Sequence, residues 1–518
     1  MSSSSSSPLQ AVPTSALVAL ATTSAAVIYG VWFYRRVTAR GDYLPQIDRA
    51  IPRIRAADTY LGMIGIFDPN QVYRITREVV EDTGSPSITH FMGRPNVYVG
   101  TPEHAREVVT KLKEKPASMR KSAGPFLGDE SVVLVPHEKW VPLRRNLGQV
   151  FHLLNMKSYF GVFVDSAHDF VARIEEHNAK RGKHFEDAKA KGLKTQPTTL
   201  LEPIDVDRCA MDLALDVVTR ALFSKNLAFQ KGDSKELSIN LARATHLFMK
   251  VLNPIFWLLH PFQYREYHRM IKWCHNLCLK WIKERQADPN NETKDLLALM
   301  LKARDPETGN PLTTEEIVSQ SFTFYFAGHD TTGHTIAWTL YEIAQHPEVE
   351  EKVHEELARV LGDKDAPSYE EAGKLTYLQW VIKETLRIHP PVGSFSRFTT
   401  ETTDIAGVTL PADCNVTVSI LAVHNSELVW PEPWRFRPER FSEEESEGRD
   451  QYAWMPFSVG ERNCIGINFA IMEVRTVVAV LCQKYLVRPS VDLLPHTQSF
   501  ITSTPVDGIY LHFLPREK

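Results

Sequence analysis

Cys464 is the residue whose surroundings point most directly to chemistry. It lies in the stretch PFSVGERNCIGINFAIMEVRTVVAVL, between Gly460 and Gly466 and two residues after Arg462, just before a helical pattern. A helix N-terminus and a neighbouring arginine both favour a thiolate over a thiol. A thiolate can serve as a nucleophile, a zinc ligand or a haem ligand. The local sequence offers no general base and no further cysteine or histidine ligands, so a single thiolate in a glycine-lined loop best fits haem ligation.

The motif AGHDTT is the second unusual feature, because it interrupts the apolar helix pattern SFTFYFAGHDTTGHTIAW with Gly328, Asp330, Thr331 and Thr332. A glycine inside a helix costs about 1 kcal/mol relative to alanine, and a buried carboxylate needs partners. Such residues are typical of a helix that another group approaches closely. A kink stabilised by threonine hydroxyls, without chemistry, is the alternative. We predict that His329 is a buried histidine with satisfied hydrogen bonds and not a ligand.

Two pairs of residues are spaced to meet on one helix face. Glu384 and Arg387 are three residues apart, and Trp140 and Arg144 are four apart. Residues at these spacings are neighbours on a helix, so each pair can act together. An exposed ion pair of little energetic value and a tryptophan that only packs in the core are the alternatives.

The elements that must position these residues are mainly helical. The spacing of apolar residues predicts helices from about 137 to 360, and a long one that begins with a capping box at Thr313 and Glu316 and ends before Pro347. Short strands are predicted between 60 and 110 and after 390, followed by a last long helix near Cys464. The polar segment 175–198 is predicted to be a solvated loop.

The N-terminus predicts a membrane anchor. Residues 16–34 carry no charge, and Arg35 and Arg36 follow them. As a helix this segment spans roughly 28 Å, close to the thickness of the hydrocarbon core of a bilayer. Because the positive charges follow the segment, we expect the rest of the chain to lie in the cytosol. A cleaved signal peptide is the alternative, but it would need a positively charged start and a shorter apolar core.

Composition sets broad limits on the function. The chain has 518 residues, a formal net charge of -4 and a pI near 6.6, so it has no basic field that favours nucleic acid. Six scattered cysteines do not make a disulfide framework, which suits a reducing compartment.

Taken together, these motifs resemble the cytochrome P-450 superfamily, specifically its eukaryotic microsomal members. The signature FxxGxRxCxG is met in full by Phe457, Gly460, Arg462, Cys464 and Gly466, and the ExxR, AGHDTT and WxxxR motifs occur in the expected order. The resemblance implies a mainly α fold with a minor β part, a helical prism with small sheets around a buried haem b. It also implies a division into a luminal segment (1–15), a transmembrane anchor (16–34), a linker (35–60) and a catalytic domain (61–518).

The resemblance also assigns expected roles to individual residues. Cys464 is expected to be the axial ligand of the haem iron, within a cofactor-binding loop that includes Phe457, Gly460 and Gly466. Asp330 and Thr331 are expected to deliver protons, and Gly328 to leave room for haem and dioxygen. A cationic seat for the haem propionates is expected from Trp140, Arg144, Arg397, Arg462 and Arg120. A structural triad that braces the Cys464 loop is expected from Glu384, Arg387 and Arg440.

The expected reaction is insertion of one oxygen atom from O2 into a lipophilic small molecule, such as a fatty acid, a sterol, a terpenoid, a polyketide or a xenobiotic. Electrons are expected from NADPH through a separate membrane-bound flavoprotein reductase, at the endoplasmic reticulum. The substrate pocket is expected around 119–134, at Val392 and Phe395, at Phe500 and Ile501, and at Phe322, Tyr325 and Phe326. The alternatives are a haem-thiolate isomerase or dehydratase that uses no O2, and a non-catalytic haem-binding carrier or sensor.

Overall fold

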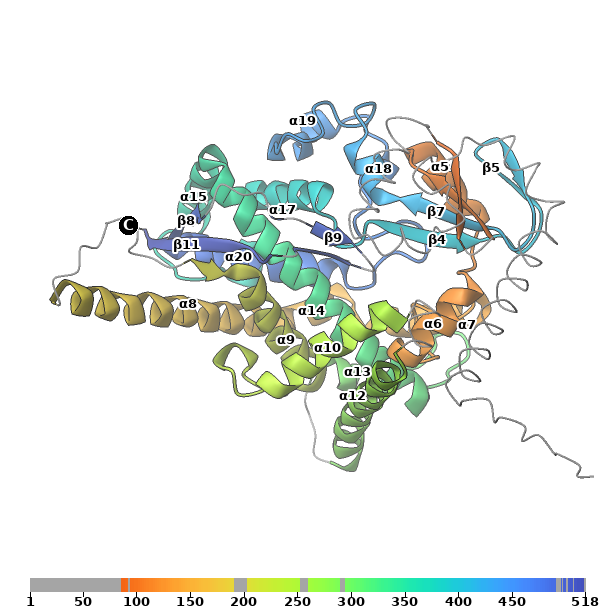
Figure 1. Ribbon diagram of the computed structural model, residues 1–518, viewed down its shortest axis with the longest axis horizontal. Coiled ribbons are helices and arrows are strands. Elements are labelled where there is room, and N and C mark those ends of the chain that lie inside the picture. Colours follow the sequence, from red (N-terminus) through yellow and green to blue (C-terminus); the bar gives the residue numbers. More distant parts are fainter. Residues whose placement is uncertain are drawn as a thin grey trace, which may run out of the picture.

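The computed structural model describes residues 85–91, 94–190, 203–251, 260–288, 294–490, 495, 497–499, 502–505 and 507–516. The predicted anchor (16–34) and linker (35–60), and the pocket positions 500 and 501, lie outside these residues. Within the described part of the chain, no helix is both long enough and apolar enough to cross a membrane. As predicted, this part is mainly helical with small sheets (Figure 1).

The helices cover most of the described chain. They are α5 (Pro102–Lys111), α6 (Ala117–Leu127), α7 (His137–Val150), α8 (Leu153–Ala190), α9 (Val206–Phe223), α10 (Lys235–Val251), α12 (Pro261–Ala287), α13 (Leu296–Lys302), α14 (Thr314–Gln345), α15 (Pro347–Leu361), α16 (Tyr369–Ala372), α17 (Thr376–Ile388), α18 (Ile420–Asn425), α19 (Glu443–Ser446) and α20 (Ile467–Lys484), with 3-10 turns at η3 (Phe229–Lys231), η4 (Pro438–Phe441) and η5 (Gln451–Ala453).

The strands of the described residues form four small sheets. They are β1 (Ser87–Phe91), β2 (Arg94–Val99), β3 (Ile204–Asp205), β4 (Ser394–Phe398), β5 (Thr403–Ile405), β6 (Val408–Leu410), β7 (Asn415–Ser419), β8 (Tyr485–Pro489), β9 (Thr497–Ser499), β10 (Ser503–Pro505) and β11 (Tyr510–Pro515). The largest sheet has the order β1-β2-β7-β4, in which β2 and β7 are parallel. It lies with α5 at one end of the molecule, and β8 and β11 lie at the other (Figure 1).

Helix α14 runs through the middle of the molecule, where it packs against α9, α12, α17 and α20 (Figure 1). Its start is fixed by the predicted capping box, because the Thr313 hydroxyl accepts from the backbone N–H of Glu316 and the Glu316 carboxylate accepts from that of Thr313. It ends at Gln345, and Pro347 opens α15. Neighbours on all sides explain why its sequence is apolar nearly all round.

The prediction of a solvated loop over 175–198 was wrong for its first part. Helix α8 continues to Ala190, and Lys180 pairs with Glu176 one turn earlier at 2.7 Å. The segment is rich in alanine, lysine and glutamate, which form helices well even without a buried face. A polar sequence therefore indicated solvent exposure here but not the absence of a helix.

Glu384 is the centre of a fully buried ionic network between α17 and η4. Its carboxylate accepts from Arg387 Nε and Nη2 at 2.8 and 2.9 Å and from Arg440 Nε at 3.2 Å. All three side chains are at most 1% exposed. A carboxylate with two guanidinium partners is stable in such a place only because each charge is paired and hydrogen-bonded.

The remaining donors of the two arginines fix nearby loops. Arg387 donates to the carbonyls of His424 and Pro433 at 2.8 and 2.6 Å. Arg440 donates to the carbonyls of Pro431 and Glu432 at 2.5 and 2.7 Å. His424 in turn accepts at Nε2 from the backbone N–H of Met455, two residues before Phe457. The network therefore ties α17 to the segment that leads into the Cys464 loop.

We predict that Glu384→Gln lowers the free energy of unfolding by about 3 to 5 kcal/mol, the range for removing one charge from a buried ion pair. Chemical denaturation of the purified protein measures this change. Glu370→Gln is the matched control, because Glu370 pairs with Lys157 at the surface, and its stability should stay close to that of the wild type. Equal stability of the two variants would contradict the structural role of the network.

Candidate active site

The loop that carries Cys464 is shaped by its glycines and by one hydrogen bond. The backbone N–H of Cys464 donates to the carbonyl of Phe457 at 2.9 Å, which closes the loop just before α20. Gly460 has φ +76°, and a Cβ there would lie 3.2 Å from the Cβ of Val109. The backbone angle therefore favours glycine, and the close approach of α5 leaves little room for a side chain. Ser458 also has positive φ, at 59°, which is a strained conformation for a residue with a side chain.

Cys464 is the exposed member of the six cysteines, and the other five are buried. Its exposure is to an internal cavity, which it lines together with residues of α14 and α20. Burial within the protein raises the pKa of its thiol, while the backbone N–H of Gly466 and the guanidinium of Arg144 act in the opposite direction. A bound metal ion would shift this balance decisively, because a coordinating thiol loses its proton.

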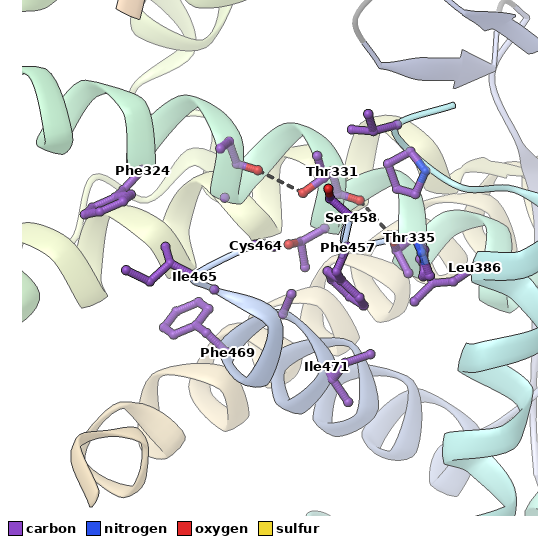
Figure 2. Close-up of a pocket in the computed structure, with 18 of the residues that line it drawn as sticks. Phe324, Thr331, Thr335, Leu386, Phe457, Ser458, Cys464, Ile465, Phe469 and Ile471 are labelled. Carbon is purple, nitrogen blue, oxygen red and sulfur yellow. Dashed lines mark hydrogen bonds between the residues drawn. The ribbon is translucent and has the colours of Figure 1, made fainter. Parts of the chain in front are cut away.

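The cavity lies between α14 on one side and the Cys464 loop with the start of α20 on the other (Figure 2). Thr331 and Thr335 point into it from α14, and Ile465 and Phe469 border it beside Cys464 (Figure 2). Its lining is largely apolar: Phe151, Val218, Leu296, Phe324, Ala327, Leu386, Pro391, Val392, Phe395, Ile420, Pro456, Phe457, Ile465, Phe469, Ala470, Ile471 and Val474.

On the α14 wall, the AGHDTT motif divides between two faces of the helix. Ala327, Gly328, Thr331 and Thr332 line the cavity, whereas the buried Asp330 does not. The Thr331 hydroxyl donates to the carbonyl of Ala327 at 2.8 Å, as a threonine inside a helix commonly does. The acid and the alcohol are therefore adjacent in sequence but face different surroundings.

A group of cations borders the Cys464 loop. The guanidinium of Arg462, itself a lining residue, lies 4.8 Å from the centre of the Trp140 ring and donates to the carbonyl of Val135 at 3.3 Å. Its Nε is buried without a hydrogen-bond partner. Arg144 donates to the side-chain oxygen of Asn463 at 2.8 Å. The structure thus brings the residues of the WxxxR motif to the cysteine loop.

Two further cations complete this group, and one of them was missed by the sequence analysis. Burial and the nearby charges of Arg397 and Arg462 lower the pKa of Lys115 to about 7. Burial and Arg462 likewise lower the pKa of Arg397 to about 10. Like charges crowded together favour the uncharged form of a base, whereas an anion placed among them favours the charged form. Lys115 stands outside every motif of the sequence, so only its position in the fold reveals it.

The other predicted positions fall into two groups. Val392 and Phe395 line the cavity. Phe322, Tyr325 and Phe326 of α14 are buried but do not line it. Arg120 lies on α6, where Glu130 is its ion-pair partner at 4.0 Å. His329 is buried and its Nδ1 lies 2.9 Å from the carbonyl of Tyr325, which confirms a core histidine.

Helix geometry explains why Phe324 lines the cavity and its neighbours do not. Phe324, Ala327, Gly328, Thr331 and Thr335 recur at intervals of three and four residues, and all five line the cavity. This spacing defines one face of an α-helix. Counting back from Thr331 by the helical period would have selected Phe324 from the sequence alone.

These features fit a haem with its iron on Cys464. The sulfur faces a cavity with apolar walls, which suits the porphyrin faces. Gly328 lies in the α14 wall of this cavity, but the side chain that it lacks would meet Val218 of α9 at 3.1 Å. The crowded cations and the unpartnered Nε of Arg462 suit the two carboxylates of the haem. A single thiolate ligand with an open side toward Thr331 is the donor set of a haem-thiolate centre.

Comparisons with known proteins agree with the geometry. The family model named Cytochrome P450 matches residues 59–512. Cytochrome P450 4V2 of Mus musculus is 30% identical over 468 residues, which cover 85% of this chain and 84% of that protein. Cytochrome P450 4F8 of Homo sapiens is 28% identical over 495 residues, 90% of each chain. Cytochrome P450 4B1 of Rattus norvegicus is 28% identical over 449 residues, 82% of each chain.

The fold and the site define a haem-thiolate protein, and the chain belongs to the cytochrome P450 family. It is accordingly a cytochrome P450 monooxygenase with haem as its cofactor.

We predict that Arg462→Leu speeds haem loss by about 10- to 100-fold, because a hydrogen bond to a charged group is worth about 1.5 to 3 kcal/mol. The rate of haem transfer to apomyoglobin measures this loss. Arg120→Leu is the control and should lose haem at nearly the wild-type rate. Faster loss from the Arg120 variant than from the Arg462 variant would overturn the assignment of the cationic seat.

Proposed function

We propose that the chain inserts one oxygen atom of O2 into a lipophilic small molecule, with electrons from NADPH delivered by a separate flavoprotein reductase. The observation that carries this proposal is the pairing of an apolar cavity with a single cysteine sulfur facing a threonine-bearing helix. Haem held in this cavity supplies the activation of O2. The protein's own part is to bind the cofactor and the substrate and to control water and protons.

Most of the predicted site residues have a proposed part in this chemistry. Cys464 holds the iron, and the Phe457–Gly466 loop keeps the sulfur directed into the cavity. Arg462, Arg144, Arg397 and Trp140 hold the carboxylate edge of the haem. Lys115 joins them because its charge lies among theirs. Thr331 keeps a hydroxyl on the cavity wall, where it can hold water and pass a proton onward.

The residues that line the cavity indicate the class of substrate. Apart from Cys464, Arg462, Ser458 and the threonines of α14, the lining consists of glycine, proline, phenylalanine and aliphatic residues, including Phe324, Phe395 and Val392. Such walls bind apolar ligands by removing their surface from water. Fatty acids, sterols, terpenoids, polyketides and lipophilic xenobiotics all present such surfaces.

The membrane environment is part of the proposal. Residues 16–34 form an uncharged segment long enough to span a bilayer and are followed by arginines, which supports a single-pass anchor with a cytosolic catalytic domain from about residue 61. The endoplasmic reticulum is the proposed location, because a membrane-bound reductase and lipophilic substrates meet there.

One experiment tests these elements together. Microsomes from cells that co-express the full chain and an NADPH-dependent P450 reductase are washed with alkaline carbonate, then given NADPH and dodecanoic acid, cholesterol, farnesol or naphthalene. We expect NADPH-dependent oxygenated product from at least one compound, and we expect the activity to stay with the washed membranes. Activity that needs neither NADPH nor O2 would contradict monooxygenation, and its complete release by carbonate would contradict the anchor.

A further inference from the structure

Asp330 is a buried carboxyl group that does not line the cavity. Its side chain is buried on a face of α14 outside the cavity, and its Oδ2 is buried without a hydrogen-bond partner. An orphaned buried carboxyl oxygen costs free energy, so it calls for a functional explanation. A carboxyl group that passes protons into the cavity must also receive them from elsewhere.

His334 lies one helical turn after Asp330 and connects it to a second carboxylate. The Nδ1 of His334 lies 2.7 Å from Oδ1 of Asp207, and its Nε2 lies 3.9 Å from Oδ1 of Asp330. The imidazole is 5% exposed, and its Nε2 is buried without a hydrogen-bond partner. The two nitrogens of one ring therefore face two carboxylates, and the side toward Asp330 is left open.

Asp207 connects His334 and Asp330 to the solvent. It lies in the first turn of α9, and its side chain is 14% exposed, so solvent can reach it. Helix α9 packs closely on α14 at this level. A Cβ added to Gly333 of α14 would lie only 3.1 Å from the Cα of Met211 of α9. The close packing holds the histidine between the two acids.

We propose that Asp207 and His334 form a proton relay from solvent to Asp330, and this proposal rests on the monooxygenase function proposed above. The proton on Nε2 of the His334 imidazolium passes to Oδ1 of the Asp330 carboxylate, and Asp330 releases it through water toward Thr331. The neutral ring then turns so that its free Nε2 takes a proton that solvent has placed on Asp207, and it turns back as the imidazolium. One proton enters from solvent for each proton delivered, so the charges of both acids and of the ring are restored.

The distances fit a relay that opens and closes. The 2.7 Å contact is a strong hydrogen bond, whereas 3.9 Å is too long for a direct one. A bridging water or a rotation of the Asp330 side chain closes this gap. The described titratable groups that face His334 are Asp207 from α9, and Asp330 and His329 from α14. The two carboxylates raise the pKa of His334 against the effect of burial, which keeps a proton available on the ring.

The test compares His334→Gln and Asp207→Asn with Asp205→Asn. Asp205 is the N-cap of the same helix, and asparagine keeps a capping side chain while removing the same charge. Haem-loaded enzymes with reductase are assayed with the panel compound that the wild type oxidises, for product per NADPH, hydrogen peroxide release and the solvent isotope effect. A second readout, independent of turnover, is the titration of the His334 ring by NMR on histidine-labelled protein, assigned by its loss in His334→Gln.

We expect His334→Gln to lower the rate of product formation by about 100-fold, the low end of general acid–base contributions, with more peroxide per NADPH and a larger solvent isotope effect. Asp207→Asn should show the same pattern more weakly and should lower the pKa of His334, because a negative charge beside the ring is removed. Asp205→Asn should match the wild type.

Two results would overturn the relay. One is coupling and an isotope effect in His334→Gln equal to those of the wild type. The other is loss of activity with unchanged peroxide yield and isotope effect, which would mark a merely structural histidine. A wild-type enzyme that oxidises no compound and consumes no NADPH would instead overturn the proposed function, and the relay with it.

Discussion

The architecture depends on presenting one sulfur atom to an apolar cavity while the backbone around it remains hydrogen-bonded. A thiolate in such surroundings is costly unless positive charge and N–H donors lie close by. The Cys464 loop meets this constraint with the backbone N–H of Gly466 and the guanidinium of Arg144. Its shape places both Ser458 and Gly460 at positive φ, which is a strained conformation for the serine. A loop with this much local strain holds its form only if the surrounding structure is rigid.

That rigidity comes from buried charges and from one central helix. Glu384, Arg387 and Arg440 satisfy one another and several loop carbonyls at once, so the segments that lead to the cysteine loop cannot shift independently. Helix α14 provides the opposite wall. One of its faces carries Thr331 into the cavity, and another carries Asp330 and His334 against α9. Cofactor binding and proton supply are thereby assigned to different faces of the same helix.

Much of this could be predicted from the sequence, because short motifs fix local geometry. The capping box at Thr313 predicted the start of α14, and the glycines around Cys464 indicated a cofactor-binding loop. What could not be predicted depends on packing between distant segments. Lys115 joins the cationic group only because its segment folds beside Arg397 and Arg462. Asp207 meets His334 across 127 residues of chain, and no local pattern marks that contact.

The most direct test of the central claim is the carbon monoxide difference spectrum of the reduced protein. With Cys464 as the thiolate ligand of haem iron, the wild type should show a strongly red-shifted Soret band. Cys464→Ala should lose this band, while Cys482→Ala, which removes a buried thiol in α20, should keep it. A folded, haem-loaded wild type without the band, or a Cys464→Ala variant that retains it, would contradict thiolate ligation by Cys464.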